Sequence, residues 1–483
     1  MEKSSGILLA ISSLPNKYGI GSFGDDAKRF VDFLKKSKIK YWQILPLGPT
    51  SIGDSPYQSY SSYAINPYFI DLDWLVSQGL LTNDDLKDYI HDTKYVDYGY
   101  IFNTRFNILQ KAYNYHNKYQ IEFDKFKEEN KEWLDGYAVF MMLHREHENK
   151  GLEDWYPDFK FKVGHAMDWA LNEYKDEVDY FKFIQYLAYK EYFILKDYAN
   201  KNGIKIIGDI PFYCAYDSHD LYDNREMFQL NPDLTPKNVA GCPPDFFSED
   251  GQLWGNPCYD FEKQKLDKFK WYKARINHQL KLYDVLRIDH FRAFAGYYEI
   301  PYGMKNAKIG RWAKGPGYEL FKGIDSSRII AENLGFITPD VKRLLTKTKF
   351  LGINVFQFEL GDGIHSPIKK ESYSNSVLYS GTHDNECLYS FYINSEAKYK
   401  KLIDKLCNIS VLDNPNFKII EYLFKKDSPL VIIPMQDYLS KDLSSRMNTP
   451  STPFGNWCYR VSKEELNNEL SKCIRNLITR CNR

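Results

Sequence analysis

Eight short apolar segments recur along the chain, and each ends in polar or turn-forming residues. Continuous apolar runs of this length are typical of strands buried on both faces, as in a parallel sheet. Eight such strands favour an α/β fold with a closed (β/α)8 TIM barrel, although periodicity alone does not distinguish it from an open doubly wound sheet. The segments span residues 6–10, 41–45, 204–209, 285–291, 328–334, 353–358, 377–380 and 430–435.

Helical patterns lie between these segments. After the first segment, Phe30, Phe33 and Leu34 share one helical face. After the fifth, Pro339 stands at the expected first position of a helix, where proline is favoured. This alternation predicts a single barrel over residues 1–483.

Two connections are much longer than one crossover helix. Residues 60–200 contain helical patterns, and we expect a mostly helical insertion that stands over the C-terminal face of the barrel. Residues 222–283 form a second insertion, between the third and fourth predicted strands.

Charge and cysteine content make several partners improbable. The 64 basic and 64 acidic residues balance, which gives no electrostatic reason to expect nucleic acid or an anionic membrane. The apolar runs are too short for a signal peptide or a membrane span. The 8 cysteines are scattered without a CxxC pair, so we expect a cytoplasmic protein, and no metal or organic cofactor is indicated.

A GxGxxG pattern occupies residues 19–24, after a predicted strand and before a predicted helix. A dinucleotide site needs an acidic residue at the end of the next strand, about 20 residues further on, to bind the ribose. Here that strand is followed by Pro46 and Leu47, and the next acid is Asp54. The pattern therefore favours a turn over a dehydrogenase site.

Carboxylates stand at the ends of four predicted strands: Asp209, Asp289, Glu332 and Asp384. Catalytic side chains in (β/α)8 barrels come from the C-terminal ends of several strands. A single acid in such a place is more often a cap or an ion pair. Four acids that converge on one rim indicate chemistry.

Two of these acids have contrasting surroundings. Arg287 and Asp289 are two residues apart in a strand, so they share a face, and the guanidinium should lower the pKa of Asp289. Glu332 follows an apolar run that should raise its pKa. One ionised and one protonated carboxyl suit a retaining glycosidase. These residues alone fit equally well a buried Arg–Asp pair and a helix-capping Glu.

Nine segments in order resemble the 4-α-glucanotransferases, the amylomaltase or disproportionating-enzyme family. The resemblance runs nearly from end to end. The segments are SLPNKYGIGSFG, ILPLGPT, DSPYQSYSSYAINPY, GDIPFYCAYDS, PPDFFSEDGQLWGNPCY, RIDHFRAFAGYYEIP, IAENLG, YSGTHDN and QDYLSKDLSSRMNTPSTPFGNW.

The resemblance implies a transfer of α-1,4-glucan segments between malto-oligosaccharides or chains derived from starch or glycogen. Asp289 would be the nucleophile that forms a covalent glucosyl-enzyme, and Glu332 the acid/base. Asp384 would bind the ring hydroxyls of the distorted sugar. These three are the catalytic residues that the family pattern implies.

The same resemblance implies a set of substrate-binding residues. Arg287 would keep Asp289 ionised, and residues 241–257 would form a mobile loop over the cleft. The other positions expected to contact or line the sugar site are Tyr57, Asp209, Phe246, Phe247, Gln252, Trp254, His290 and His383.

Five positions depart from the family pattern. Asn333 follows the acid/base where the family usually has Asp, and Phe246 lacks the hydroxyl of a usual Tyr. Glu386-Cys387 replaces Asp-Thr, and Tyr459 stands where Trp is common. These departures leave the acceptor preference and the rate open.

Two other functions remain open at this point: an α-amylase-like retaining hydrolase and a glucan-binding scaffold without catalysis. The same three acids serve transfer and hydrolysis. The long insertions and the aromatic cleft loop favour transfer, because transfer needs a bound acceptor and little reactive water. The three intact acids argue against a scaffold.

Overall fold

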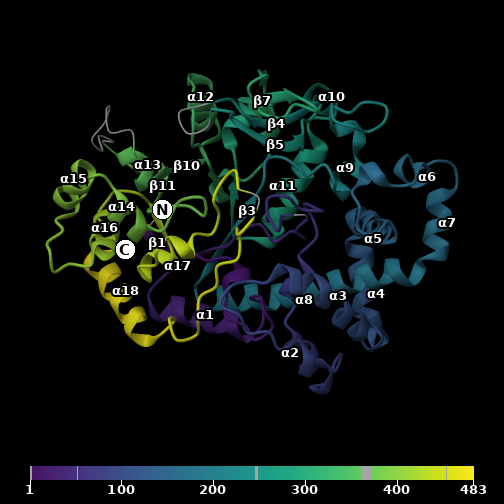
Figure 1. Cartoon of the computed structure of the whole chain (residues 1–483), viewed down its shortest axis with the longest axis horizontal. Helices are drawn as coiled ribbons and strands as arrows, with labels where there is room; N and C mark the ends of the chain where they lie inside the picture. The colour runs from purple at the N-terminus through teal and green to yellow at the C-terminus, as the bar shows by residue number, and fades with distance from the viewer. Residues whose placement is uncertain (1–2, 52, 245–248, 362–371, 453) are drawn as a thin grey trace.

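A closed barrel of eight parallel strands forms the centre of the protein, in the order β1-β12-β11-β10-β9-β6-β3-β2 (Figure 1). The computed structural model describes residues 3–51, 53–244, 249–361, 372–452 and 454–483. The barrel strands are β1 (Ser4–Leu8), β2 (Tyr41–Gln43), β3 (Lys205–Ile210), β6 (Val285–Ile288), β9 (Ile329–Ala331), β10 (Leu351–Val355), β11 (Ser376–Tyr379) and β12 (Leu430–Pro434).

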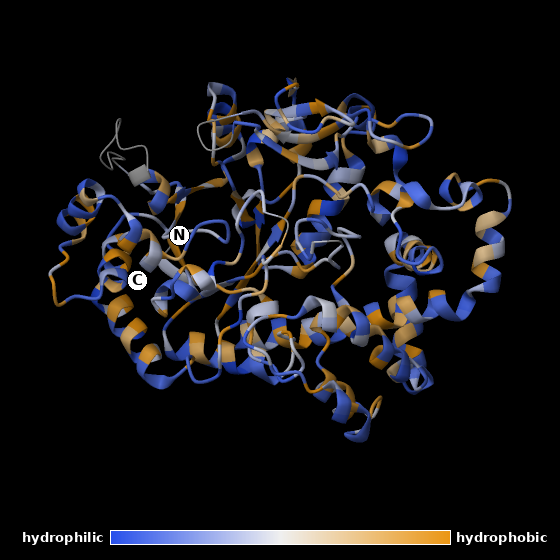
Figure 2. Ribbon diagram, in the orientation of Figure 1, coloured by the Kyte–Doolittle hydropathy of each residue, from blue (hydrophilic) through white to orange (hydrophobic). Residues whose placement is uncertain are grey.

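The eight apolar segments of the sequence are these eight strands, which confirms the predicted barrel. Strand β1 pairs in parallel with both β2 and β12, and this closure excludes the open doubly wound alternative. All five residues of β12 are buried, as expected for strands enclosed on both faces. Figure 2 shows apolar residues along the central strands and mixed apolar and polar residues in the surrounding helices.

The crossover helices begin where the sequence places their start signals. Helix α1 (Asp25–Lys36) follows Gly24 and buries Phe30, Phe33 and Leu34 against the core. Helix α12 (Pro339–Thr348) has its proline in the first turn. A Cβ on Gly21 would lie 1.9 Å from the carbonyl oxygen of Ile11, so the GxGxxG segment is a close-packed turn.

Between β2 and β3 the chain is mainly helical and lies to one side of the barrel (Figure 1). Helix α8 is the long element that packs on β3 and α1, and α3, α4, α5 and α7 pack on α8. Within α8, the buried Gln185 accepts a hydrogen bond from the Ile65 N–H at 2.9 Å. The helices are α2 (Leu72–Ser77), α3 (Tyr98–Tyr113), α4 (Gln120–Glu129), α5 (Lys131–Glu146), α6 (Pro157–Lys160), α7 (Ala166–Glu173) and α8 (Lys175–Lys201).

A four-stranded antiparallel sheet, which was not predicted from the sequence, stands above the barrel in Figure 1. Its order is β5-β4-β7-β8, so the hairpin of β4 (Asn238–Cys242) and β5 (Gln252–Pro257) joins that of β7 (Gly296–Pro301) and β8 (Arg311–Lys314). Three of the four β8 residues are exposed, so this edge strand lacks the apolar run that identifies the barrel strands.

The remaining helices flank these elements. No helix in the described ranges is long and apolar enough to cross a membrane. They are α9 (His219–Asp223), α10 (Phe261–Leu266), α11 (Lys270–Leu282), α13 (Phe356–Gly361), α14 (Leu388–Asn394), α15 (Ala397–Cys407), α16 (Pro415–Phe424), α17 (Met435–Tyr438) and α18 (Asn468–Arg480).

Gly208 provides a stability test of the barrel. A Cβ at this position in β3 would lie 2.0 Å from a ring atom of the buried Tyr283. We expect Gly208→Ala to destabilise the fold by about 1–3 kcal/mol through overpacking, measured as a lower Tm. Gly99→Ala is the control, because its Cβ would meet only Asp97 Oδ1 at 3.5 Å. Equal melting temperatures for the two variants would contradict this account.

Candidate active site

Asp289 and Glu332 lie side by side at the C-terminal rim of the barrel. The β6–β9 register pairs Ile288 with Ala331, and the two acids are the next residues of those strands. The Glu332 N–H donates to the Ile288 carbonyl at 2.9 Å, which extends the pairing by one residue. Neighbouring strands are about 4.8 Å apart, so both carboxyl side chains start from adjacent points.

Arg287 joins two carboxylates beneath this rim. Its Nη2 lies 3.0 Å from Asp289 Oδ1, and its Nη1 lies 2.5 Å from Asp209 Oδ2. Although burial opposes it, the two acids raise the pKa of Arg287 well above its usual value. Burial raises the pKa of Asp209, and the guanidinium opposes this shift. The predicted Arg287–Asp289 pair is therefore present, and Asp209 is a second partner.

The environment of Glu332 favours its protonated form. Burial, together with the charge of Asp289, raises its pKa to about 7, as the apolar sequence around it indicated. The backbone N–H groups of His290 and Leu334 donate to its two oxygens at 2.8 and 2.7 Å and fix the carboxyl group in place. A carboxyl with this pKa can act as either acid or base near neutral pH.

Tyr57 and His383 form a stacked pair beside Asp209. Their ring centroids are 4.9 Å apart with an interplanar angle of 19°. The Tyr57 hydroxyl donates to Asp209 Oδ2 at 2.7 Å. Burial, and after it the negative charge of Asp209, raises the pKa of Tyr57 well above its usual value. The tyrosine thus stays protonated as a donor. Trp457 lies 5.8 Å from both rings.

Asp384 is placed after β11 by contacts from a C-terminal segment. Asn448 Nδ2 donates to Asp384 Oδ1 at 2.6 Å, and the Arg446 guanidinium donates to the Asp384 carbonyl. His383 Nε2 is 3.4 Å from the same carboxylate oxygen. The carboxylate side chain is 44% exposed, so it remains open to a ligand.

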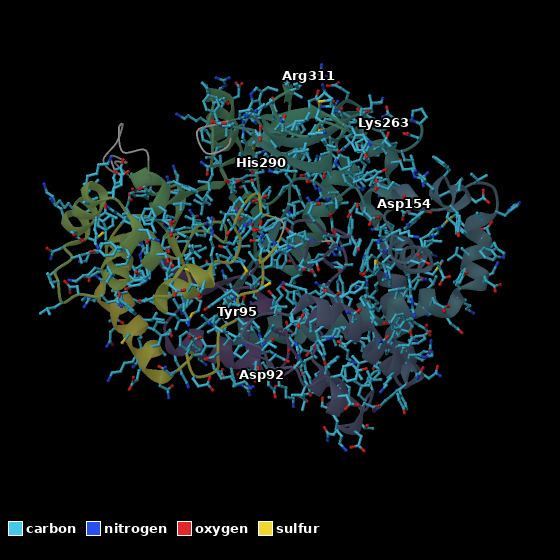
Figure 3. All side chains as sticks on the ribbon, in the orientation of Figure 1. Asp92, Tyr95, Asp154, Lys263, His290 and Arg311 are labelled. Carbon is cyan, nitrogen blue, oxygen red and sulfur yellow. The ribbon has the colours of Figure 1, made fainter. Side chains whose placement is uncertain are left out.

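His290 lies next to the four-stranded sheet (Figure 3), and Trp254 of β5 in that sheet packs against it. The Trp254 ring meets His290 edge to face at 4.9 Å, and its Nε1 donates to Gln252 Oε1 at 3.0 Å. Burial lowers the pKa of His290 to about 4, so the imidazole is neutral near pH 7. Phe246 and Phe247, expected in the same loop, lie outside the described residues.

Comparison with known proteins identifies the family of this chain. The family model described as 4-alpha-glucanotransferase matches residues 9–466. The chain belongs to the 4-α-glucanotransferase family. A Clostridium butyricum 4-alpha-glucanotransferase is 43% identical over 96% of this chain and 97% of its own length. One from Streptococcus pneumoniae serotype 4 is 40% identical over 99% and 97%.

A solved member of the 4-α-glucanotransferase family has nearly the same fold. The amylomaltase from Streptococcus agalactiae, solved in complex with acarbose, aligns with a TM-score of 0.96 and 37% identity, and all of both chains is covered. The amylomaltase from Corynebacterium glutamicum shares the fold, with a TM-score of 0.79 at 16% identity, over 98% of this chain and 75% of its own.

One departure from the family pattern has a structural explanation. Asn333 Oδ1 accepts the Ile353 N–H at 2.7 Å, so this side chain bonds β10. Its amide oxygen makes a bond that an aspartate oxygen would also make. Two other departures are Tyr459 and Glu386. The Tyr459 side chain is buried. The Glu386 carbonyl accepts a hydrogen bond from Gln357 Nε2 at 2.9 Å.

Sequence reasoning missed three residues that contact the expected ones: Arg446, Asn448 and Trp457. All three lie in the C-terminal segment that resembles the family. This segment contributed to the family resemblance. However, none of the three residues is a carboxylate or a histidine, so none was predicted to belong to the active site. Among the described residues, no group of three or more His, Cys, Asp or Glu is arranged to hold a metal ion.

The bridging guanidinium is expected to stabilise the fold as well as the site. Arg287→Met leaves Asp209 and Asp289 buried or half-buried without their cation, so we expect a loss of about 3–5 kcal/mol in unfolding free energy. Denaturant unfolding measures it. Arg343→Met, which breaks an exposed pair with Asp340, serves as the control and should cost less than about 1 kcal/mol. A similar small loss for both variants would show that the bridge is not required for stability.

Proposed function

We propose that the chain transfers α-1,4-glucan segments between malto-oligosaccharides, or to glucose, by a retaining double displacement. The observation that carries this proposal is the position of Asp289 and Glu332 directly after Ile288 and Ala331, which pair at the ends of the adjacent strands β6 and β9. Retaining enzymes need two carboxyl groups about 5 Å apart, one as nucleophile and one as acid/base. Donors and acceptors include chains derived from starch or glycogen.

In the first step, Asp289 attacks the anomeric carbon, and Glu332 donates its proton to the departing glycosidic oxygen. The ion pair with Arg287 at 3.0 Å supports an ionised nucleophile. The elevated pKa of Glu332, about 7, supports a protonated acid. The products are a covalent glucosyl-enzyme and a shortened chain with a new free end.

In the second step, Glu332 removes the proton of an acceptor hydroxyl, which attacks the anomeric carbon and releases Asp289. Asp384 binds ring hydroxyls as positive charge develops on the sugar, and His290 and His383 bond the same sugar. Tyr57 stacks on the sugar at the point of cleavage, and Asp209 lines this pocket. The cleft loop 241–257 binds the glucan chain through Phe246, Phe247, Gln252 and Trp254.

The second candidate, hydrolysis, shares the first step and differs in the attacking group. Incubation with maltotriose separates the two. Glucose together with a ladder of longer chains indicates transfer, whereas maltose and glucose without longer products indicate hydrolysis. An unchanged substrate would support a glucan-binding scaffold and refute the proposed function.

The chain organisation and the location are also part of the proposal. We propose one catalytic barrel over residues 1–483, with a helical insertion at 60–200 between its second and third strands and an insertion at 222–283 that carries the cleft loop 241–257. We place the enzyme in the cytoplasm, since Cys214, Cys258 and Cys387 are buried thiols, as expected in a reducing compartment. Nucleic acid, membrane and cofactors have no part in the reaction.

An activated donor distinguishes the nucleophile from the acid. Asp289→Asn should lower kcat at least about a thousandfold on both maltotriose and α-maltotriosyl fluoride, because no covalent intermediate forms. Glu332→Gln should be slow on maltotriose, yet give a burst of fluoride, because fluoride leaves without a proton. Near-normal turnover by Asp289→Asn would overturn the nucleophile assignment, and circular dichroism checks the fold of both variants.

The pKa of Glu332 predicts the alkaline limb of the activity profile. Only the protonated form starts the reaction, and its pKa is about 7. We therefore expect kcat/KM for maltotriose to fall by about tenfold per pH unit above this value. The limb should persist in Asp437→Asn, which leaves the groups around Glu332 intact. A kcat/KM that stays flat to pH 9 would contradict the assignment of Glu332 as the acid.

A further inference from the structure

The 381–387 loop joins β11 to α14 and carries His383 and Asp384, which the proposed function places on the donor sugar. The Asn385 carboxamide oxygen closes a turn within it, accepting from the Thr382 N–H at 2.9 Å. Two residues flank this loop and are called its two ends below: Ser380, directly after β11, and Leu388, the first residue of α14. The position of this loop decides whether the two side chains meet the substrate.

One buried carboxylate holds both ends of the loop. Asp437 lies in α17, directly after β12, which pairs in parallel with β11. The Ser380 hydroxyl donates to Asp437 Oδ2 at 2.6 Å, and the Leu388 N–H donates to Oδ1 at 2.8 Å. Asp437 is only 1% exposed, so it acts from beneath the loop without touching the substrate.

The bond to Leu388 has a particular physical value. The first N–H groups of a helix have no intrahelical acceptor, and an anion next to them is favoured by the helix dipole. Asp437 therefore caps α14 from another element of the fold. Burial raises its pKa to about 6, so the group is mostly a carboxylate at neutral pH and accepts both bonds.

A small cavity adjoins the loop. A cavity of about 20 Å³ is lined by Thr382, His383 and Glu386 of the loop and by Asp437 below it. Because a void provides no contact atoms, the loop residues that line it depend more on hydrogen bonds for their position than the buried Gly381 does. Removing the Asp437 bonds leaves room for the loop to shift.

We propose that Asp437 is a positioning residue that fixes the 381–387 loop and thereby sets His383 and Asp384 against the donor sugar. This inference rests on the proposed function. Other contacts support the loop from above: Arg446 and Asn448 bond Asp384, and Gln357 bonds Glu386. Asn448 also donates its backbone N–H to the His383 carbonyl at 3.1 Å, so these contacts hold residues within the loop, whereas Asp437 bonds the residues that flank it at both ends.

The test compares three variants at this site with a matched control. Asp437→Ala removes both bonds, and Ser380→Ala removes one. Asp437→Asn keeps a bond at each end, because its amide oxygen accepts the Leu388 N–H and its NH₂ donates to the Ser380 hydroxyl. The control is Ser428→Ala: this buried hydroxyl bonds the Ser376 and Leu430 carbonyls, at 2.7 Å each, at the opposite end of the same two strands.

Steady-state kinetics on maltotriose and acarbose affinity are the first readouts. We expect Asp437→Ala to lower kcat about 10- to 100-fold with a smaller change in KM, and to weaken acarbose binding at least about tenfold. Asp437→Asn should recover most of both, Ser380→Ala should be intermediate, and Ser428→Ala should keep wild-type values at a similar loss of Tm. The inference would be overturned if Asp437→Ala and Ser428→Ala had the same kcat. It would also be overturned if kcat fell as far in Asp437→Asn as in Asp437→Ala.

Amide hydrogen exchange provides a readout that does not need activity. Peptides covering 381–387 should exchange at least about tenfold faster in Asp437→Ala than in the wild type, while barrel peptides in β1 and β3 keep their protection. Unchanged exchange in the loop would also overturn the inference. A wild-type enzyme that leaves maltotriose unchanged would instead refute the proposed function, and the exchange comparison would still decide the role of Asp437.

Discussion

A single buried guanidinium holds the candidate site together. Arg287 lies between Asp209 and Asp289 on neighbouring strands, and without it two acids would repel one another at the rim. The contacts continue beyond these ion pairs. Asp209 accepts a hydrogen bond from the Tyr57 hydroxyl, and the Tyr57 ring stacks on His383. One cation thus contacts Asp289 directly and, through Asp209, is linked to the Tyr57 ring.

The barrel explains why two carboxyl groups so close together behave differently. Asp289 contacts the cation, whereas Glu332, one strand further round, is buried with two backbone N–H groups as its donors. The negative charge of Asp289 adds to the effect of burial and favours the proton on Glu332. Strand adjacency therefore places the two acids at neighbouring strand ends, and burial with the charge of Asp289 raises the pKa of Glu332.

The parts outside the barrel complete the site from distant stretches of the chain. Trp254 comes from a sheet that joins two hairpins on either side of β6, and Asn448 and Trp457 come from the C-terminal segment. Below the rim, Asp437 follows the last barrel strand. Each of these contributes a contact rather than a reacting group, which fits a rim whose acids are held in fixed positions before substrate arrives.

The sequence by itself determined the eight strands, the acids at their ends and the kinship with 4-α-glucanotransferases, because burial on both faces and strand-end position leave local patterns that a linear reading detects. The elevated pKa of Glu332 was also foreseen, since it follows from the apolar residues just before it. Only the tertiary structure decided that Arg287 has a second partner in Asp209, that β8 joins a sheet, and that Asp437 lies beneath the 381–387 loop. The Arg287–Asp209 and Ser380–Asp437 contacts join residues 78 and 57 positions apart, and they depend on barrel closure and strand register, which no local pattern encodes. Strand β8 is an exposed edge strand without an apolar run, so its residues carry no strand signal.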